Sequence, residues 1–281
     1  SILSDFQKKI SDLLPEIELR MHEPMARHTS FRIGGPAEVM AFPKNREELK
    51  KLLNVSALLD RKPAILGAGT NVLAPDHGLQ GLVICLKDCF NGLEAIGDHC
   101  IRIAAGVTLS RAAVFAAGLG LGGLEFAHGI PGTVGGGVYM NAGAYGGEIS
   151  AVCKSVDVMG YQGNITTFSA DEMAFSYRHS RLEDCPGIVL EAVFSLMPKP
   201  EQEIRELMRE LMAKRKASQP PEYPSAGSAF KRPVGGYAAA LIDQAGLKGF
   251  SVGGAAVSEK HAGFVVNLGN ATACDVKEIL C

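Results

Sequence analysis

The residues best suited to chemistry lie in a glycine-rich segment near the middle of the chain. Five of the nine residues from Gly129 to Gly137 are glycine, and the segment continues through Asn141 to Tyr145 and Gly146. Ordering so many glycines costs chain entropy, and consecutive N–H groups can turn towards an anion in such a segment. We therefore interpret it as an anion-binding segment, with a purely structural glycine loop as the alternative.

A second candidate, Gly67 to Leu73, directly follows the predicted strand Pro63–Leu66. Its glycines allow the backbone to approach a ligand closely, and Thr70 and Asn71 supply side-chain donors. This arrangement suits a diphosphate. A tight turn before the next strand is the alternative.

Tyr177 and Arg178 follow a turn that Ser169 and Glu172 can cap, so we expect both at a helix end. Arg178 is a candidate catalytic cation there, and the alternative is a solvated or capping arginine.

The proline-rich stretch 220–233 is predicted to be a rigid loop that presents Ser228, Lys231 and Arg232 beside an aromatic residue. Such a loop suits a charged small molecule, and a stiff linker is the alternative.

Two further patterns do not indicate a site. Gly118 to Gly123 matches G-x-G-x-x-G but follows a helical stretch, so we predict a helix-ending turn and no dinucleotide fold of the Rossmann type. The seven histidines lack metal-ligand spacing, so no metal is expected.

The composition is that of a globular protein that binds small molecules. The 281 residues are 47% hydrophobic with a formal charge of −2, which gives no electrostatic footprint for nucleic acid. Seven cysteines without Cys-x-x-Cys spacing indicate reduced, buried thiols. No apolar run reaches the roughly 20 residues of a membrane span, and no export signal is seen, so we expect a cytoplasmic protein.

Hydrophobic periodicity predicts the elements that position these residues. An amphipathic helix precedes Pro15, and a β-α-β unit follows with its helix starting at Asn45. An α+β region comes next, and then a third region with a helical stripe from Ile204 to Met212 and a last helix ending at Gly246. The expected strands of the α+β region are 82–86, 100–104, 155–159, 165–168 and 188–194, with one helix at 109–117.

Six motifs in a fixed order resemble the UDP-N-acetylenolpyruvoylglucosamine reductase family over nearly the whole chain. They are His28–Ala37, Leu66–Leu73, Gly129–Gly146, Tyr177–Ser180, Gly227–Pro233 and His261–Asn267. The short interval from Arg178 to Glu191 resembles the subgroup that lacks a tyrosine-bearing insertion.

The resemblance implies an α+β protein with a two-subdomain FAD-binding fold of the vanillyl-alcohol-oxidase type and a smaller α/β substrate-binding domain. The corresponding boundaries are 1–20 for an N-terminal helix, 21–78 and 79–199 for the FAD-binding subdomains, and 200–281 for the substrate-binding domain. It also implies FAD, NADPH, and reduction of the enolpyruvyl ether of UDP-N-acetylglucosamine to UDP-N-acetylmuramate for peptidoglycan synthesis. We expect a monomer with small-molecule partners only.

The resemblance also implies roles for individual residues. Hydride passes from NADPH through the flavin to C3 of the enolpyruvyl group, Arg178 offsets the developing charge, and Ser228 donates a proton to C2. Expected substrate contacts are Tyr177, Arg215, Gly227, Lys231 and Arg232. Expected FAD contacts are Gly67, Ala68, Gly69, Thr70, Asn71, Val72, Leu73, Ile130, Pro131, Gly132, Thr133, Val134, Gly135, Gly136, Asn141, Ala142, Gly143, Tyr145 and Gly146.

The sequence departs from the family pattern mildly at Thr70, where serine is common, and at Gly137, where alanine is common. A larger departure concerns the catalytic glutamate that the family places in a further segment, because this sequence reaches Cys281 within a predicted helix. Either the sequence is a fragment or the protein lacks that glutamate, and in the second case we expect flavin binding with poor turnover of substrate. Two other hypotheses stay open: a flavin-dependent oxidase of the same fold, and a catalytically incomplete nucleotide-binding protein.

Overall fold

The structure is a computed structural model that describes residues 2–70, 72–87, 89–220, 223–228 and 238–281. The chain divides into two compact units. Unit 1 comprises Ser1–Arg20, Met40–Ala68 and Gly81–Ala213, and unit 2 comprises Met21–Val39, Gly69–Gln80 and Lys214–Cys281. Each unit is described by itself.

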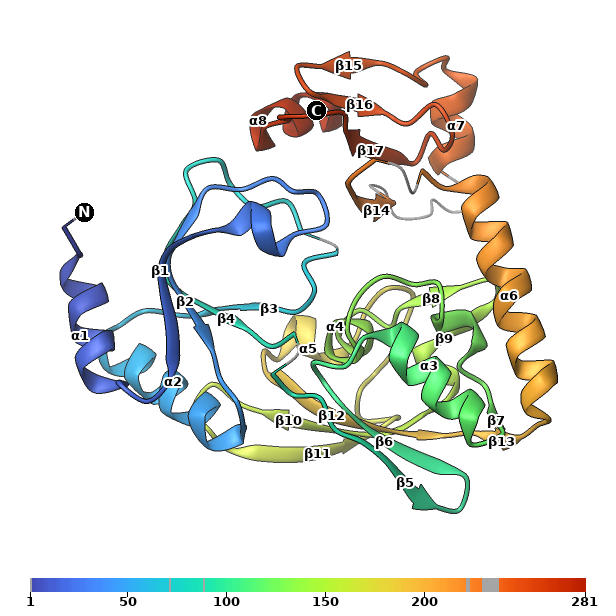
Figure 1. Cartoon of the computed structure of the whole chain (residues 1–281), viewed down its shortest axis with the longest axis horizontal. Coiled ribbons are helices and arrows are strands. Elements are labelled where there is room, and N and C mark those ends of the chain that lie inside the picture. The colour runs from blue at the N-terminus through green and yellow to red at the C-terminus, as the bar shows by residue number, and fades with distance from the viewer. Residues whose placement is uncertain (1, 71, 88, 221–222, 229–237) are drawn as a thin grey trace. The chain divides into compact units, whose positions relative to one another are not determined.

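The helices and strands are labelled in Figure 1. The α-helices are α1 (Asp5–Leu13), α2 (Arg46–Leu58), α3 (Leu109–Gly118), α4 (Val134–Tyr139), α5 (Arg181–Asp184), α6 (Glu201–Ser218), α7 (Ala238–Gln244) and α8 (Ala273–Leu280), and the 3-10 helices are η1 (Met25–His28), η2 (Glu125–Ala127) and η3 (Ile149–Ala151). The strands are β1 (Glu18–Pro24), β2 (Pro36–Phe42), β3 (Ala64–Leu66), β4 (Leu79–Cys85), β5 (Leu93–Gly97), β6 (Cys100–Ala104), β7 (Leu121–Gly122), β8 (Gly143–Ala144), β9 (Gly147–Glu148), β10 (Cys153–Met159), β11 (Ile165–Ser169), β12 (Ile188–Ser195), β13 (Met197–Pro198), β14 (Ser225–Ser228), β15 (Ser251–Val252), β16 (Ala255–Val257) and β17 (Phe264–Asn267).

The largest sheet of unit 1 has the strand order β11-β10-β12-β6-β5, and its neighbouring strands pair antiparallel. Successive strand residues face opposite sides of a sheet, so Ile101 and Ile103 of β6 enter the core together. Small and apolar residues of α3 and α4 belong to the same core, and Figure 1 shows both helices beside this sheet. The core therefore lies between one sheet face and two short helices.

The β-α-β unit near the N-terminus forms as the sequence predicts. Asn45 caps α2 by accepting a hydrogen bond from the Glu48 N–H at 2.9 Å. The helix buries Leu49, Leu52 and Leu53, and β3 pairs parallel with β4 in a sheet of order β1-β2-β4-β3. The first residue of α2 is Arg46, whose side chain reaches charged residues on the five-stranded sheet.

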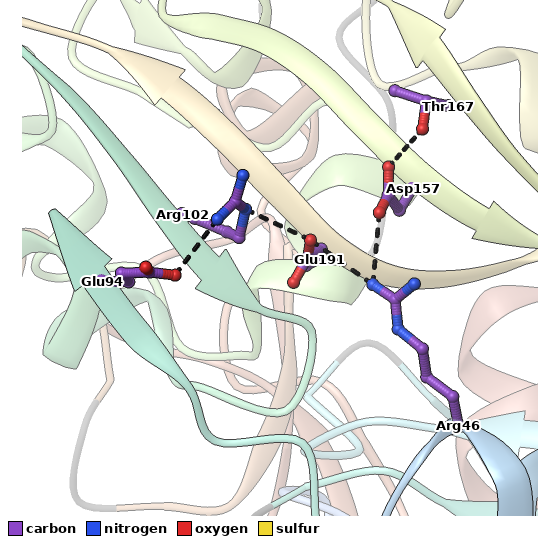
Figure 2. Close-up of polar contacts among 6 residues, drawn as sticks. All are labelled: Arg46, Glu94, Arg102, Asp157, Thr167 and Glu191. Atoms are coloured by element: carbon purple, nitrogen blue, oxygen red, sulfur yellow. Dashed lines mark hydrogen bonds and ion pairs between the residues drawn. The ribbon is translucent and has the colours of Figure 1, made fainter. Parts of the chain in front are cut away.

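An ion-pair network covers part of the sheet face that α3 and α4 leave open (Figure 2). Asp157 and Glu191 lie directly opposite each other on β10 and β12. The Nη2 atom of Arg46 lies 3.2 Å from Asp157 Oδ2 and 3.4 Å from Glu191 Oε1. Arg102 adds a contact to Glu191 at 3.3 Å. These cations offset the repulsion between two adjacent carboxylates.

Burial and the neighbouring Asp157 raise the pKa of Glu191, whereas Arg46 and Arg102 act in the opposite direction. The charged form of Glu191 therefore depends on its two arginines.

Unit 2 contains the antiparallel sheet β14-β17-β16-β15 with α8 against it. Phe31 and Ile33 enter this core from the N-terminal part of the unit. Asn267 is buried, and its Nδ2 donates to the Phe31 carbonyl at 3.0 Å. Asp76 caps α8, since its carboxylate accepts from the N–H groups of Ala273 and Cys274 at 2.7 and 3.0 Å.

The predicted elements are confirmed in type, with small shifts at their ends. The expected helix-ending turn is also confirmed, because Gly118 is the last residue of α3 and Gly120 has a φ of +68°. The stretch expected to be a loop around Ser228 instead begins with strand β14, which pairs with β17.

All seven cysteines are free thiols, as expected, but only part of the burial prediction is correct. Cys185, Cys274 and Cys281 are exposed. Burial raises the pKa of the Cys153 thiol to about 12, so this cysteine stays protonated. Among the described residues, no helix combines the length and apolar character that a bilayer crossing requires.

The ion-pair network predicts a pH-dependent loss of stability in Arg46→Ala. Removing this cation raises the folded-state pKa of Glu191 further, and a carboxyl whose pKa rises on folding destabilises the folded state once the pH exceeds that pKa. We expect a loss of about 1 kcal/mol near neutral pH that shrinks as the pH falls and is smallest below about 3, where Glu191 is protonated in both states. Chemical unfolding of both proteins across this pH range measures the difference.

Arg205→Ala is the matched control, because it removes an ion pair with Glu201 within α6. It should cost little and show no comparable pH trend. A pH-independent loss in Arg46→Ala would contradict the role given to the cation.

Candidate functional site

Arg178 lies in a tight turn. Ser176 and His179 form an antiparallel bridge and exchange both backbone hydrogen bonds at 3.1 Å, which leaves Tyr177 and Arg178 as the two residues of the turn. Arg178 has a φ of +51°, a left-handed conformation that costs energy for a side chain larger than glycine.

The prediction that Tyr177 and Arg178 lie at a helix end is wrong. Ser169 and Glu172 do cap each other, but the helical turn stops at Ala174, whose φ is +49°. The next helix, α5, begins only at Arg181. The chain therefore has room for a separate two-residue turn between the two helical segments.

The guanidinium of Arg178 points onto the end of the glycine-rich segment. Its Nη2 donates to the Gly143 carbonyl at 2.9 Å, and its Nη1 lies 3.5 Å from the Asn141 carbonyl. A Cβ on Gly143 would come within 3.0 Å of Nη1, so a larger residue would displace the arginine. Tyr177 packs on the cation with its ring centroid 5.0 Å away.

Arg178 and the adjacent His179 differ in their charged partners. His179 contacts Asp184 at 3.2 Å and Glu183 at 3.6 Å. Within the described part of the chain, Arg178 forms no ion pair, and its charge is offset by the carbonyl dipoles and the Tyr177 ring. A guanidinium held in this way can bind a carboxylate or phosphate from outside the protein.

The glycine-rich segment includes a short helix, α4, which the sequence analysis did not predict. Thr133 caps α4 by accepting from the Gly136 N–H at 3.3 Å. Gly135 has a packing role, because a Cβ there would lie 3.0 Å from the Cβ of Ala105. The glycines thus serve close packing as well as any ligand.

Gly67, which begins the other candidate segment, lies close to Thr133 of the glycine-rich segment. A Cβ on Gly67 would lie 2.7 Å from the Thr133 hydroxyl, so the two backbones come very close. In the region that the structure describes, the N–H groups of Gly132 and Thr133 have no protein acceptor, while Gly136 is exposed. These features leave backbone donors and an open glycine surface for a ligand with anionic groups.

Unit 2 holds a smaller group of the predicted residues. The Ser30 hydroxyl donates to the Ser225 carbonyl at 2.5 Å and lies 3.3 Å from the Gly69 carbonyl. It thereby joins the loop that begins at Gly69 to strand β14, which ends at Ser228. The backbone of Ser228 pairs with Phe264, while its side chain is outside the description.

The predicted site residues fall into three groups. Unit 1 brings together Gly67, Ala68, Tyr177, Arg178 and the segment 130–146, whereas unit 2 holds Gly69, Thr70, Val72, Leu73, Arg215, Gly227 and Ser228. Arg215 is in the last turn of α6. Asn71, Lys231 and Arg232 lie outside the described residues, and all assignments of ligand contacts stay predictions.

Sequence reasoning missed the roles of three polar residues, namely Ser30, Asn141 and Ser180. Asn141 and Ser180 are fully buried, and their side chains bond to backbone groups of other segments. Asn141 was predicted to contact a ligand, yet its side-chain amide is used inside the protein. Such long-range side-chain bonds leave no local spacing signal in a sequence.

The packing of α4 predicts opposite effects for two neighbouring glycines. Gly135→Ala should destabilise by about 1–3 kcal/mol because its Cβ meets the backbone of Ala105. Gly136→Ala meets only Thr133 Oγ1 at an ordinary 3.6 Å and should be neutral or stabilise by up to about 1 kcal/mol. Thermal unfolding distinguishes them.

Cofactor content must be measured on the same samples, because a bound ligand adds its own stabilisation. Equal stability of the two variants at equal cofactor content would contradict the packing role of Gly135.

Comparison with known proteins places both parts of the chain. The FAD binding domain profile matches residues 37–169, and the C-terminal domain profile of UDP-N-acetylenolpyruvoylglucosamine reductase matches residues 219–280. A protein of Agathobacter rectalis named UDP-N-acetylenolpyruvoylglucosamine reductase is 47% identical over 286 residues, covering 98% of this chain and 91% of the relative.

Solved structures agree with the sequence matches. The UDP-N-acetylenolpyruvylglucosamine reductase of Thermus caldophilus superposes with a TM-score of 0.83 and 37% identity, covering 94% of this chain and 93% of that one. A BBE-like protein of Physcomitrella patens, with a TM-score of 0.51 and 12% identity over 69% of this chain and 44% of that one, shares the fold alone. The chain therefore belongs to the UDP-N-acetylenolpyruvoylglucosamine reductase family.

Proposed function

We propose that this protein is an FAD-dependent reductase that uses NADPH to convert the enolpyruvyl ether of UDP-N-acetylglucosamine to UDP-N-acetylmuramate in peptidoglycan synthesis. Family membership over nearly the whole chain supports the reaction class. The observation that carries the proposal is the Arg178 guanidinium, which lies at the end of the glycine-rich segment and pairs with no carboxylate among the residues that the structure describes.

Unit 1 fits a flavin nucleotide by its donors and its shape. Thr133 and Gly132 offer backbone N–H groups, the Gly67 backbone comes close to Thr133, and Gly136 is exposed. Closely spaced backbone donors suit a diphosphate, and an exposed glycine lets a flat ring system approach. When bound, FAD supplies hydride transfer between the nicotinamide and the substrate.

Arg178 has the electrostatic role. Its fixed guanidinium can make a bidentate contact with the enolpyruvyl carboxylate and offset the negative charge that develops beside it. The left-handed backbone and the bond to the Gly143 carbonyl hold the cation before substrate arrives, so little reorganisation is needed.

Ser228 is the proposed proton donor to C2 of the enolpyruvyl group. A serine hydroxyl is a weak acid, so it requires nearby cations to deliver a proton, and Lys231 and Arg232 follow it within four residues. Tyr177, Arg215 and Gly227 are proposed substrate contacts. Strand β14 gives Ser228 a rigid base through its pairing with β17.

The proposal extends to the setting of the enzyme. Seven free thiols are typical of a reducing compartment, which supports action in the cytoplasm. We also propose a monomer whose partners are NADPH and the UDP-sugar.

The two half-reactions test the function separately. Under anaerobic conditions, NADPH should bleach the flavin absorbance of the full-length protein, and enolpyruvyl-UDP-N-acetylglucosamine should restore it. Protein without flavin absorbance would contradict the proposal. Rapid recolouring by oxygen with none by the UDP-sugar would favour an oxidase of the same fold.

Variants should separate the roles of the two proposed catalytic residues. Arg178→Ala should bleach normally with NADPH but recolour about 10²–10³-fold more slowly, because it loses charge stabilisation. Ser228→Ala should slow recolouring about 10²–10⁴-fold through loss of the proton donor. Arg181→Ala is the control, since that cation packs on Phe168 with its ring centroid 4.6 Å away. Recolouring at the normal rate in either catalytic variant would remove that residue from the mechanism.

A further inference from the structure

Two fully buried polar side chains attach the Arg178 turn to the glycine-rich segment. Asn141 Nδ2 donates to the Ser176 carbonyl at 2.9 Å, just before the turn. Ser180 Oγ donates to the Tyr139 carbonyl at 2.5 Å, just after the turn. The turn is therefore fixed at both ends to the same short stretch of backbone.

Asn141 is itself held rigidly. Its Oδ1 accepts from the Ser150 N–H at 2.9 Å, so both polar groups of the amide are occupied. Its backbone is left-handed with a φ of +48°, and its carbonyl lies 3.5 Å from Nη1 of Arg178. One residue thus contacts the turn that carries Arg178, the arginine side chain, and the backbone that follows the glycine-rich segment.

This geometry conflicts with a direct ligand contact by the Asn141 amide. Turning the amide towards a ligand would break its two partly buried hydrogen bonds, to the Ser176 carbonyl and from the Ser150 N–H, at a cost of about 1 kcal/mol each. Ser180 is similarly committed, because its Oγ also accepts from the Leu182 N–H at 3.3 Å and caps α5.

We propose that Asn141 and Ser180 are positioning residues for the reduction: they hold the Arg178 turn against the glycine-rich segment, so that the guanidinium faces the substrate carboxylate at a fixed position. This inference rests on the proposed role of Arg178. A displacement of about 1 Å in a positioned catalytic group can cost about 10²-fold in rate, so buried anchors on both sides of the turn have a direct effect on catalysis.

Loss of either side chain should affect flavin binding and flavin reoxidation by substrate differently. Neither side chain reaches outward, so removing one should leave cofactor binding and reduction by NADPH nearly intact. The substrate-dependent step should suffer, because only that step requires Arg178 in place.

Asn141→Ala and Ser180→Ala test this in the full-length protein. We expect flavin content and the rate of bleaching by NADPH to stay within about twofold of the unaltered protein, and recolouring by saturating enolpyruvyl-UDP-N-acetylglucosamine to slow about 10–100-fold. Loss of flavin from Asn141→Ala at normal folding would overturn the proposal in favour of a cofactor contact. The two variants remove the anchors one at a time, so poor folding of one leaves the other as the test.

Ser56→Ala is a matched control for Ser180→Ala. Ser56 is also fully buried, and its Oγ donates to the Arg61 carbonyl at the end of α2. Both variants lose one hydroxyl bond from a buried serine to a carbonyl, and Ser180→Ala also loses the bond to the Leu182 N–H that caps α5, so its stability should fall somewhat further. Slower recolouring in Ser56→Ala by the same factor would show a general effect of stability and would overturn the proposal.

A double-mutant cycle distinguishes positioning from an independent effect. If Asn141 acts through Arg178, Asn141→Ala combined with Arg178→Ala should recolour no more slowly than Arg178→Ala alone. Multiplied losses would overturn the positioning role while leaving the role of Arg178 intact. Normal recolouring in Arg178→Ala would instead overturn the role of Arg178 in the proposed function.

Discussion

The close packing of the glycine-rich segment against the end of β6 is the constraint on which the site in unit 1 depends. The Gly135 N–H donates to the Ala105 carbonyl at 3.0 Å, and the Val134 N–H donates to the Val107 carbonyl at 2.8 Å. This contact sets the start of α4 and so places Thr133 beside Gly67. Because α4 has only six residues, the same contact also fixes the position of its C-terminal end. The carbonyls of Asn141 and Gly143, which contact Arg178, follow directly after that end.

The charged groups of unit 1 follow a consistent division. On one sheet face, Arg46 and Arg102 neutralise the adjacent carboxylates of Asp157 and Glu191. Near the glycine-rich segment, Arg178 contacts carbonyl groups and the Tyr177 ring, and no described carboxylate pairs with it. Paired cations of this kind support the fold to a modest degree, whereas a pre-positioned cation without a counter-charge is suited to stabilise negative charge on a substrate.

Much of this arrangement could be predicted from local patterns. Helix caps such as Asn45 and the alternating strands of the large sheet obey short-range rules, and the predicted elements are confirmed. The ordered motifs predicted the family and the FAD-binding fold, which the profile and structure matches confirm. One local prediction failed and one helix was not predicted, for a shared reason. The turn at Arg178 and the helix within the glycine-rich segment depend on contacts with distant backbone, to Gly143 in one case and Ala105 in the other.

The sequence by itself determined which residue types are present for chemistry: a guanidinium at Arg178, a hydroxyl at Ser228, and glycines that permit close backbone approach. It also determined the order of the elements, because periodicity and caps act over a few residues. Only the tertiary structure decided that Asn141 faces inward and that, among the described residues, no carboxylate pairs with Arg178. Those outcomes depend on which buried polar groups can satisfy one another across the fold, and no spacing along the chain specifies such pairs.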